Sequence, residues 1–119
     1  MAIHNELGKE GEKIAVDYLV KKGYKILEKN WRYQKAEVDI IAAFENTLAI
    51  VEVKTRTNSY FGNPQDFINP KKIKLLVSAA NEYVISKNLD VDVRFDIVAI
   101  ITNKKVTEIE HLENAFLYF

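Results

Sequence analysis

Residues 37–56, EVDIIAAFENTLAIVEVKTR, predict two apolar strands joined by a tight turn, because runs rich in Val, Ile, Leu and Ala flank the polar pair at 45–46. Four charges interrupt these strands, at Glu37, Asp39, Glu52 and Lys54. Residues two apart share a strand face, so a two-residue turn places all four on one face, with Asp39 opposite Glu52. The same register sets Glu37 opposite Lys54, whereas an odd loop or a bulge would change it.

Two opposed carboxylates normally destabilise a sheet, so this face needs compensation. Water, a shared proton or a divalent cation would each supply it, and hard cations prefer carboxylate oxygen. A partly covered cleft with two acids and a lysine suits Mg²⁺-assisted phosphoryl chemistry, whereas a solvated face with a weak ion pair is the plainer alternative. The opposite face is expected to meet a helix and carries Val38, Ile40, Ala42, Val51 and Val53.

The rest of the chain extends this hairpin into the order α-β-β-β-α-β-β. Apolar residues at three- and four-residue spacings predict two helices, one ended by Gly23 and one begun by Asn69 and Pro70. Outside the hairpin, the predicted helices cover 6–22 and 70–88, and the predicted strands cover 24–27, 91–102 and 106–112. We therefore expect one α/β domain over 1–119, a three-layer sandwich with a central mixed sheet. The second helix acts as the crossover that makes the fourth strand parallel to the third.

Composition restricts the classes of function. The chain has 119 residues and no cysteine, which excludes disulfide scaffolds and cysteine-ligated zinc or iron–sulfur sites. Lys plus Arg and Asp plus Glu both total 17, so tight non-specific nucleic-acid binding is disfavoured while a local basic groove stays open. No apolar run reaches a membrane-span length and the N-terminus lacks a secretory pattern, so we expect a cytoplasmic protein with no membrane partner.

The order of motifs resembles a known nuclease superfamily. An acid, a hairpin turn and then E-x-K, between a helix and a crossover helix, is similar to the PD-(D/E)XK restriction-endonuclease-like pattern. The segments GKEGEKIAVDYLVKKGYKILEKNWR, EVDIIA, IVEVKTR, FG, RFDIVAI and AF resemble, in order, the YraN-like family of uncharacterised bacterial proteins. This likeness covers nearly the whole chain. Val38 stands where the superfamily name has proline, which many members lack.

The resemblance implies a site but no substrate. It implies that Asp39 and Glu52 bind Mg²⁺ or Mn²⁺, with the main-chain carbonyl of Val53 as a further ligand and Lys54 as the catalytic lysine. Glu12 is similar to an additional acid near the metal in branches that resemble the archaeal Holliday-junction resolvases. From the residues alone, Glu12 lies beside the apolar stripe of its helix, where it either reaches a cleft or remains a surface carboxylate.

Further polar residues are candidates for supporting roles. Glu37 is either a second metal ligand or the partner of Lys54, and we favour pairing or a water contact on the substrate side. Gln65 either positions water or phosphate or caps its loop. A nucleic-acid-binding rim is expected from basic residues that are otherwise solvated surface charges, namely Arg32, Arg56, Lys71, Lys72 and Lys74. Asp96 is expected to be structural, in an ion pair with Arg94 on its own strand or in a hydrogen bond at the strand end.

These observations predict a divalent-metal-dependent nuclease that hydrolyses phosphodiester bonds, with DNA favoured over RNA and branched or structured DNA among the candidate substrates. One alternative is a nucleic-acid-binding protein of nuclease-like fold with little or no catalysis. Another is an interaction protein whose acidic face is structural. The apolar C-terminus leaves a homodimer open.

Overall fold

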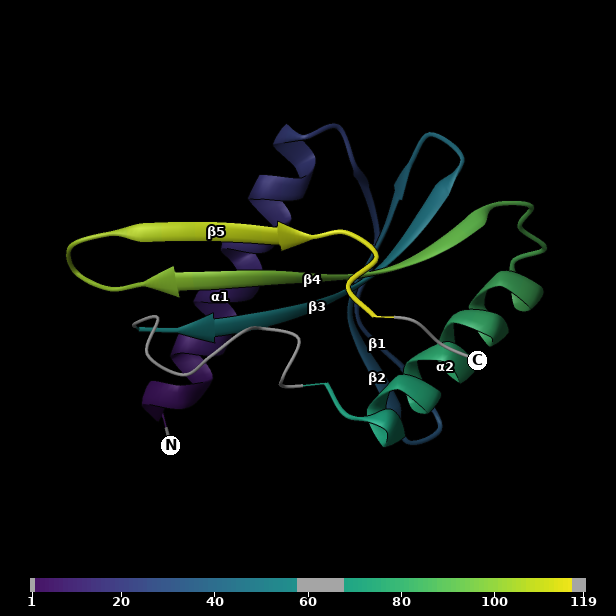
Figure 1. Cartoon of the computed structure of the whole chain (residues 1–119), viewed down its shortest axis with the longest axis horizontal. Coiled ribbons are helices and arrows are strands. Elements are labelled where there is room, and N and C mark those ends of the chain that lie inside the picture. The colour runs from purple at the N-terminus through teal and green to yellow at the C-terminus, as the bar shows by residue number, and fades with distance from the viewer. Residues whose placement is uncertain (1, 58–67, 117–119) are drawn as a thin grey trace.

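The computed structural model describes residues 2–57 and 68–116, with the side chains of the first helix described from residue 6 onward. The element order is the predicted α-β-β-β-α-β-β. The elements, shown in Figure 1, are α1 Ala2–Lys21, β1 Lys25–Tyr33, β2 Ala36–Phe44, β3 Thr47–Arg56, α2 Pro70–Ser86, β4 Asp92–Thr102 and β5 Thr107–Leu112.

One mixed sheet forms the middle layer, with the strands in the order β1-β2-β3-β4-β5. The first three strands are antiparallel to one another, β4 runs parallel to β3, and β5 runs antiparallel to β4. A parallel pair needs a crossover connection, and α2 lies in the connection from β3 to β4. The predicted mixed sheet and its crossover are therefore confirmed.

The two helices cover opposite faces of this sheet, which gives the three layers visible in Figure 1. Ala15 and Leu19 of α1 pack with Val51 and other residues of one face. Leu76 and Tyr83 of α2 belong to the cluster on the other face. Each cluster buries aliphatic and aromatic side chains, and this burial stabilises the fold at roughly 25 cal/mol per Å² of apolar surface removed from water.

The helix ends follow the sequence signals. Gly23 has φ of +99°, the left-handed conformation that follows many helix C-termini. Asn69 caps α2, because its side-chain Oδ1 accepts a hydrogen bond of 2.8 Å from the backbone N–H of Lys72. Pro70 begins the helix, where its missing N–H is not needed.

Two expectations about the strands were wrong. The first strand does not end at residue 27 but runs to Tyr33, because the segment from Glu28 to Tyr33 pairs with β2 along the sheet edge even though most of its residues are polar. Val38 does not share a cluster with Ile40: it packs beneath α2, whereas Ile40 packs beneath α1. The alternation of faces changes at Asp39, the residue just before β2 begins its regular pairing with β3.

Gly11 marks a close approach between α1 and β3. A Cβ atom at this position would lie 1.8 Å from Oγ1 and 2.8 Å from Cβ of Thr55, so no side chain fits without movement. We expect Gly11→Ala to lower the free energy of unfolding by about 1–3 kcal/mol, although alanine favours helix. Gly8→Ala is the matched control, since a Cβ there meets nothing within 4 Å and should stabilise α1 by up to about 1 kcal/mol. Urea denaturation measures both, and equal stabilisation by the two changes would contradict the close contact.

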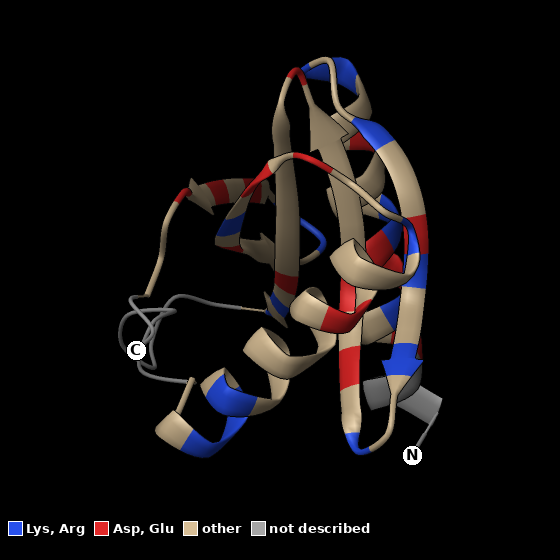
Figure 2. Cartoon of the chain, turned by 90° about the vertical axis from the view of Figure 1, so that its right-hand side faces the viewer, with Lys and Arg blue, Asp and Glu red and all other residues tan. Residues whose placement is uncertain are grey.

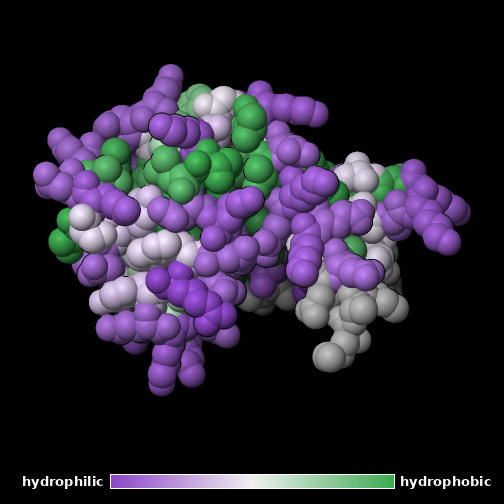
Figure 3. Space-filling view, turned by 180° about the vertical axis from the view of Figure 1, so that it is seen from behind, coloured by the Kyte–Doolittle hydropathy of each residue, from purple (hydrophilic) through white to green (hydrophobic). Residues whose placement is uncertain are grey.

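Among the described helices, neither combines the length and the apolar character that a membrane crossing requires. Seen from behind, the surface is mostly hydrophilic, with hydrophobic side chains gathered over one part of it (Figure 3). The apolar stripe of α1 is turned inward, where Ala15 and Leu19 are fully buried.

Candidate metal-binding site

The hairpin has the predicted register. Phe44 pairs with Thr47, so a two-residue turn joins β2 to β3, and the ladder continues to the pair Ile40–Val51. One residue further, where Asp39 would face Glu52, the main-chain pairing gives way to a side-chain contact. The backbone N–H of Val53 donates a 2.8 Å hydrogen bond to Oδ2 of Asp39. This bond holds the Asp39 carboxylate at the end of the ladder, next to β3.

Glu52 is a buried carboxylate with incomplete hydrogen bonding. It is only 1% exposed, and its Oε1 lies 2.8 Å from Nζ of Lys72 on α2. Its Oε2 is buried and has no hydrogen-bond partner among the described residues. A buried, unsatisfied charged acceptor is costly in free energy. A cation bound at Oε2 would remove that cost.

The charge of Glu52 acts on Asp39. Burial, the neighbouring Glu52 and, to a smaller extent, Glu12 raise the pKa of Asp39, the Val53 hydrogen bond and Lys72 oppose the shift, and the resulting pKa is about 7. Near neutral pH without a metal, the Asp39 carboxyl is therefore close to half-protonated. A divalent ion stabilises carboxylates that are held close together, and so does a shared proton. The two are therefore alternative ways to offset the repulsion between Asp39 and Glu52.

Two lysines lie beside the acids. Burial lowers the pKa of the Lys54 ammonium, with the charge of Lys72 acting in the same direction and those of Glu52 and Asp39 opposing it. Burial also acts to lower the pKa of Lys72, but its hydrogen bond and ion pair with Glu52 outweigh this, and the pKa is raised. At this site the pKa of the Lys54 ammonium is therefore lowered, and that of the Lys72 ammonium is raised.

An open cleft of about 740 Å³ lies between α1 and β3, next to these lysines. Its polar lining includes Glu12, Asp39, Lys54, Arg56 and Lys72. A smaller hollow of about 280 Å³ lies between β2 and the start of α2, and Asp39 and Lys72 line both spaces. Figure 2 shows basic residues on the first turns of α2 and acidic residues on the neighbouring strands. A nucleic-acid backbone in this cleft could therefore place its phosphates beside the acids and along the lysines at the start of α2.

The structure separates the other predicted site residues. Glu12 lies in the cleft and accepts a hydrogen bond of 3.2 Å from Nδ2 of Asn30. Glu37 does not pair with Lys54: its Oε2 lies 3.0 Å from Nε of Arg32, its register partner on β1, and both side chains are exposed. The Lys54 pairing expected for Glu37 was therefore wrong, because β1 supplies a nearer cation.

Predicted rim residues differ in position. Lys71 and Lys74 are exposed on α2, as surface cations are, whereas Lys72 turns inward to Glu52. Arg56 lines the cleft and its Nη1 donates a hydrogen bond of 2.8 Å to the carbonyl of Thr55. Gln65 lies outside the described residues. Sequence reasoning grouped Lys72 with the rim, and only the angular position on α2 separates it from its neighbours.

The donor set fits a small hard cation. Within the described part of the chain, no three His, Asp or Glu side chains lie close enough together to hold a metal ion, so Glu12 does not join Asp39 and Glu52 as a third direct ligand. Magnesium does not need three such ligands, since it keeps several waters and is commonly held by one or two carboxylates and substrate phosphate oxygens. The unpartnered Oε2 of Glu52, near Asp39, meets that requirement, and Val53 is among the residues that line the cleft.

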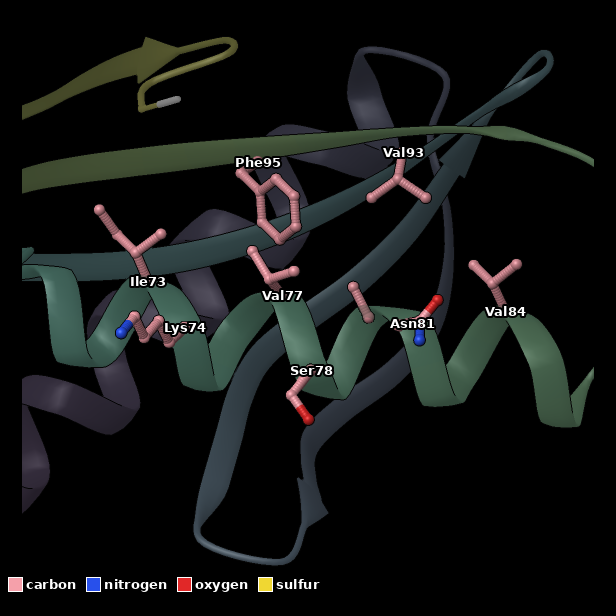
Figure 4. Close-up of a pocket in the computed structure, with 9 residues that line it drawn as sticks. Ile73, Lys74, Val77, Ser78, Asn81, Val84, Val93 and Phe95 are labelled. Atoms are coloured by element: carbon pink, nitrogen blue, oxygen red, sulfur yellow. The ribbon is translucent and has the colours of Figure 1, made fainter. Parts of the chain in front are cut away.

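A different, apolar groove of about 350 Å³ runs between α2 and the start of β4. Figure 4 shows Ile73, Val77 and Val84 lying toward Phe95 and Val93. Lys74 is its one titratable lining residue within the described chain, so this groove offers no acid–base pair.

A second buried acid, Asp96, lies away from the cleft. It is fully buried and accepts hydrogen bonds from Nε and Nη2 of Arg94 at 2.9 and 2.8 Å, which confirms the predicted ion pair. It also contacts Nε2 of His111 at 2.8 Å and the backbone N–H of Asn114 at 3.2 Å. Nδ1 of His111 lies 3.1 Å from the hydroxyl of Tyr18. This cluster ties α1, β4 and the end of β5 together.

Comparisons with known proteins place the chain among close relatives. The sequence model of the uncharacterised protein family UPF0102 matches residues 11–100. A UPF0102 protein of Christiangramia forsetii is 64% identical and one of Flavobacterium psychrophilum is 60% identical, each over 119 residues that cover both chains completely. A UPF0102 protein of Phocaeicola vulgatus is 47% identical over 98% of this chain and 96% of its own. The expected uncharacterised bacterial family is confirmed, while the wider nuclease superfamily stays a prediction.

Proposed function

Because this chain belongs to the uncharacterised protein family UPF0102, whose description names no reaction, we propose its function from its own side chains. The proposed function is that of a cytoplasmic, divalent-metal-dependent nuclease that hydrolyses phosphodiester bonds of nucleic acid, with DNA favoured over RNA. The observation that carries the proposal is Glu52, which is buried beside a second acid and has one carboxylate oxygen without a partner.

The residues take distinct roles in this proposal. Asp39 and Glu52 would hold Mg²⁺ or Mn²⁺, with the carbonyl of Val53 as an additional oxygen ligand. When bound, such an ion stabilises negative charge on the phosphate and lowers the pKa of bound water. Glu12, in the same cleft, would orient water of the hydration shell.

Lys54 is the residue proposed to act on the reacting groups. Its ammonium is partly buried in the cleft and near both acids, and its lowered pKa allows it to move a proton more readily than an exposed lysine. Held beside a phosphate, the ammonium orients the attacking water and offsets developing negative charge. Arg56 and the exposed Lys71 and Lys74 would hold neighbouring phosphates, which carry no sequence information.

The test is cleavage of single-stranded, duplex and branched DNA and RNA with Mg²⁺ or Mn²⁺ and with EDTA. We expect metal-dependent cleavage by the wild type and a loss of at least roughly a hundredfold in both Asp39→Ala and Lys54→Ala, the scale of removing one charge-stabilising group. Glu110→Ala, an exposed change on the distant β5, is the control and should retain activity. Binding without cleavage by the wild type would favour the nuclease-like binding module instead. Neither binding nor cleavage would refute both.

A further inference from the structure

Lys72 differs from the other lysines of its helix. It lies in the first turn of α2, where the Asn69 side chain fixes its backbone N–H, and its Nζ lies 2.8 Å from Oε1 of Glu52. Its side chain is 38% exposed, whereas Glu52 is 1% exposed. Lys71, one residue before it, and Lys74, two residues after it, are exposed. Of these three lysines, only Lys72 therefore points from the first turn of α2 into the acidic site.

The contact with Lys72 is the compensation that Glu52 has in the absence of a metal. The other oxygen of Glu52 is buried without a partner among the described residues, so the Lys72 ammonium supplies the direct ion pair to this carboxylate, with the Lys54 ammonium nearby. A divalent ion on Glu52 would bring a second, stronger positive charge to the same group. Two cations near one carboxylate repel each other, so the ion has to compete with the ammonium.

The position of Lys72 gives the displaced ammonium a place to go. The residue lines both the cleft between α1 and β3 and the smaller hollow between β2 and α2. A flexible four-carbon stem lets its ammonium swing between these spaces while its backbone stays capped. Release from Glu52 therefore requires side-chain rotation only.

Resting on the proposed function, we propose that Lys72 is an internal counter-ion of the metal site, which holds Glu52 in the metal-free protein, competes with the divalent ion for it and thereby weakens metal binding. Lys72 is a positioning residue in this scheme, acting through Glu52. A metal-free site held together in this way stays folded without an ion.

Mn²⁺ binding measured by isothermal titration calorimetry, without nucleic acid, tests this proposal. Lys72→Met keeps the apolar stem and removes the charge, and Lys71→Met is the matched control on the exposed side of the same turn. We expect Lys72→Met to bind Mn²⁺ about tenfold more tightly than the wild type, and Lys71→Met to bind within about twofold of it, where tenfold corresponds to about 1.4 kcal/mol. Equal or weaker binding by Lys72→Met would overturn the counter-ion role.

Thermal denaturation gives a second readout that does not depend on activity. In EDTA, Lys72→Met should melt below Lys71→Met because Glu52 loses its cation, and added Mn²⁺ should raise the melting temperature of Lys72→Met more. If the wild type binds no Mn²⁺, the proposed function fails and the counter-ion role fails with it. If the wild type binds Mn²⁺ and the two methionine variants behave alike, the counter-ion role alone fails.

Discussion

Asp39→Asn is expected to remove metal-dependent cleavage and at the same time to stabilise the metal-free protein at pH 8. Burial and the charge of Glu52 raise the pKa of Asp39 to about 7, so ionisation of this carboxyl opposes folding above that pH. Asparagine carries no charge, and its side-chain oxygen still accepts the hydrogen bond from Val53. We expect a gain of about 2 kcal/mol, below the roughly 4 kcal/mol that the full rise of this pKa corresponds to, because Asp39 retains contact with water.

The pH dependence fixes the sign of this effect. Between pH 4 and 7 the folded protein binds the Asp39 proton more tightly than the unfolded chain does, so the contribution of Asp39 to stability is present below pH 4 and is lost as the pH rises through 7. Urea denaturation in EDTA at pH 5 and pH 8 should show the gain from Asp39→Asn mainly at pH 8. Glu110→Gln, an exposed carboxyl on β5, should change neither value. A loss of stability at pH 8 would show that Asp39 is a structural acid.

Asp96→Ala is expected to have the opposite effect, a loss of about 3–5 kcal/mol in the free energy of unfolding at pH 7, because one partner of a buried ion pair is removed. The change leaves the Arg94 guanidinium and the backbone N–H of Asn114 without their acceptor, and His111 loses its partner. Asp92→Asn, an exposed change at the start of the same strand, should cost less than about 0.5 kcal/mol.

The wild-type protein offers a pH test of the same cluster. Burial acts to raise the pKa of Asp96, but hydrogen bonds from His111, Arg94 and Asn114 outweigh it and the pKa is lowered. Its contribution to stability is therefore present above the unfolded-state pKa, near 4, and is lost as the pH falls below it. Urea denaturation between pH 3 and 7 should show this loss in the wild type and a weaker one in Asp96→Ala. An unchanged pH profile would mean that the cluster contributes no net stability.

Asp96 and Asp39 thus differ in how the fold treats their charge. Asp96 is surrounded by donors that favour its charge, and its pKa falls. Asp39 lies partly buried beside another acid, and its pKa rises. A carboxyl group whose charged form is destabilised by its surroundings is typical of ligand-binding and catalytic sites. That contrast, not the presence of an acid in a strand, distinguishes the cleft.

Local signals in the sequence were sufficient for much of this arrangement. The polar pair at 45–46 predicts the two-residue turn, and the register that this turn sets holds as far as the pair Ile40–Val51, one residue from Asp39 and Glu52. Asn69 and Pro70 predict the start of α2, because a cap depends on adjacent residues alone. The element order and the parallel β3–β4 pair follow from the length of the crossover.

What the sequence did not reveal depends on contacts between distant segments. The second half of β1 is polar, and only its partner β2 makes it a strand. Lys72 and Lys71 are adjacent lysines in the sequence, and which of them turns toward Glu52 depends on how α2 packs on the sheet. No pattern in the sequence links His111 to Tyr18, although the two side chains meet across the fold.

The Asp96 cluster also has a consequence for the order of folding. Asp39 and Glu52 come from one hairpin, whose loop closes early and at a low entropic cost. Tyr18 and His111 are 93 residues apart, so their contact requires nearly the whole chain to be in place. During synthesis, the acidic pair can therefore meet long before the contact that fastens the first helix to the last strand. The contact between Tyr18 and His111 therefore forms late, and a chain released before residue 111 would carry both carboxylates without this contact.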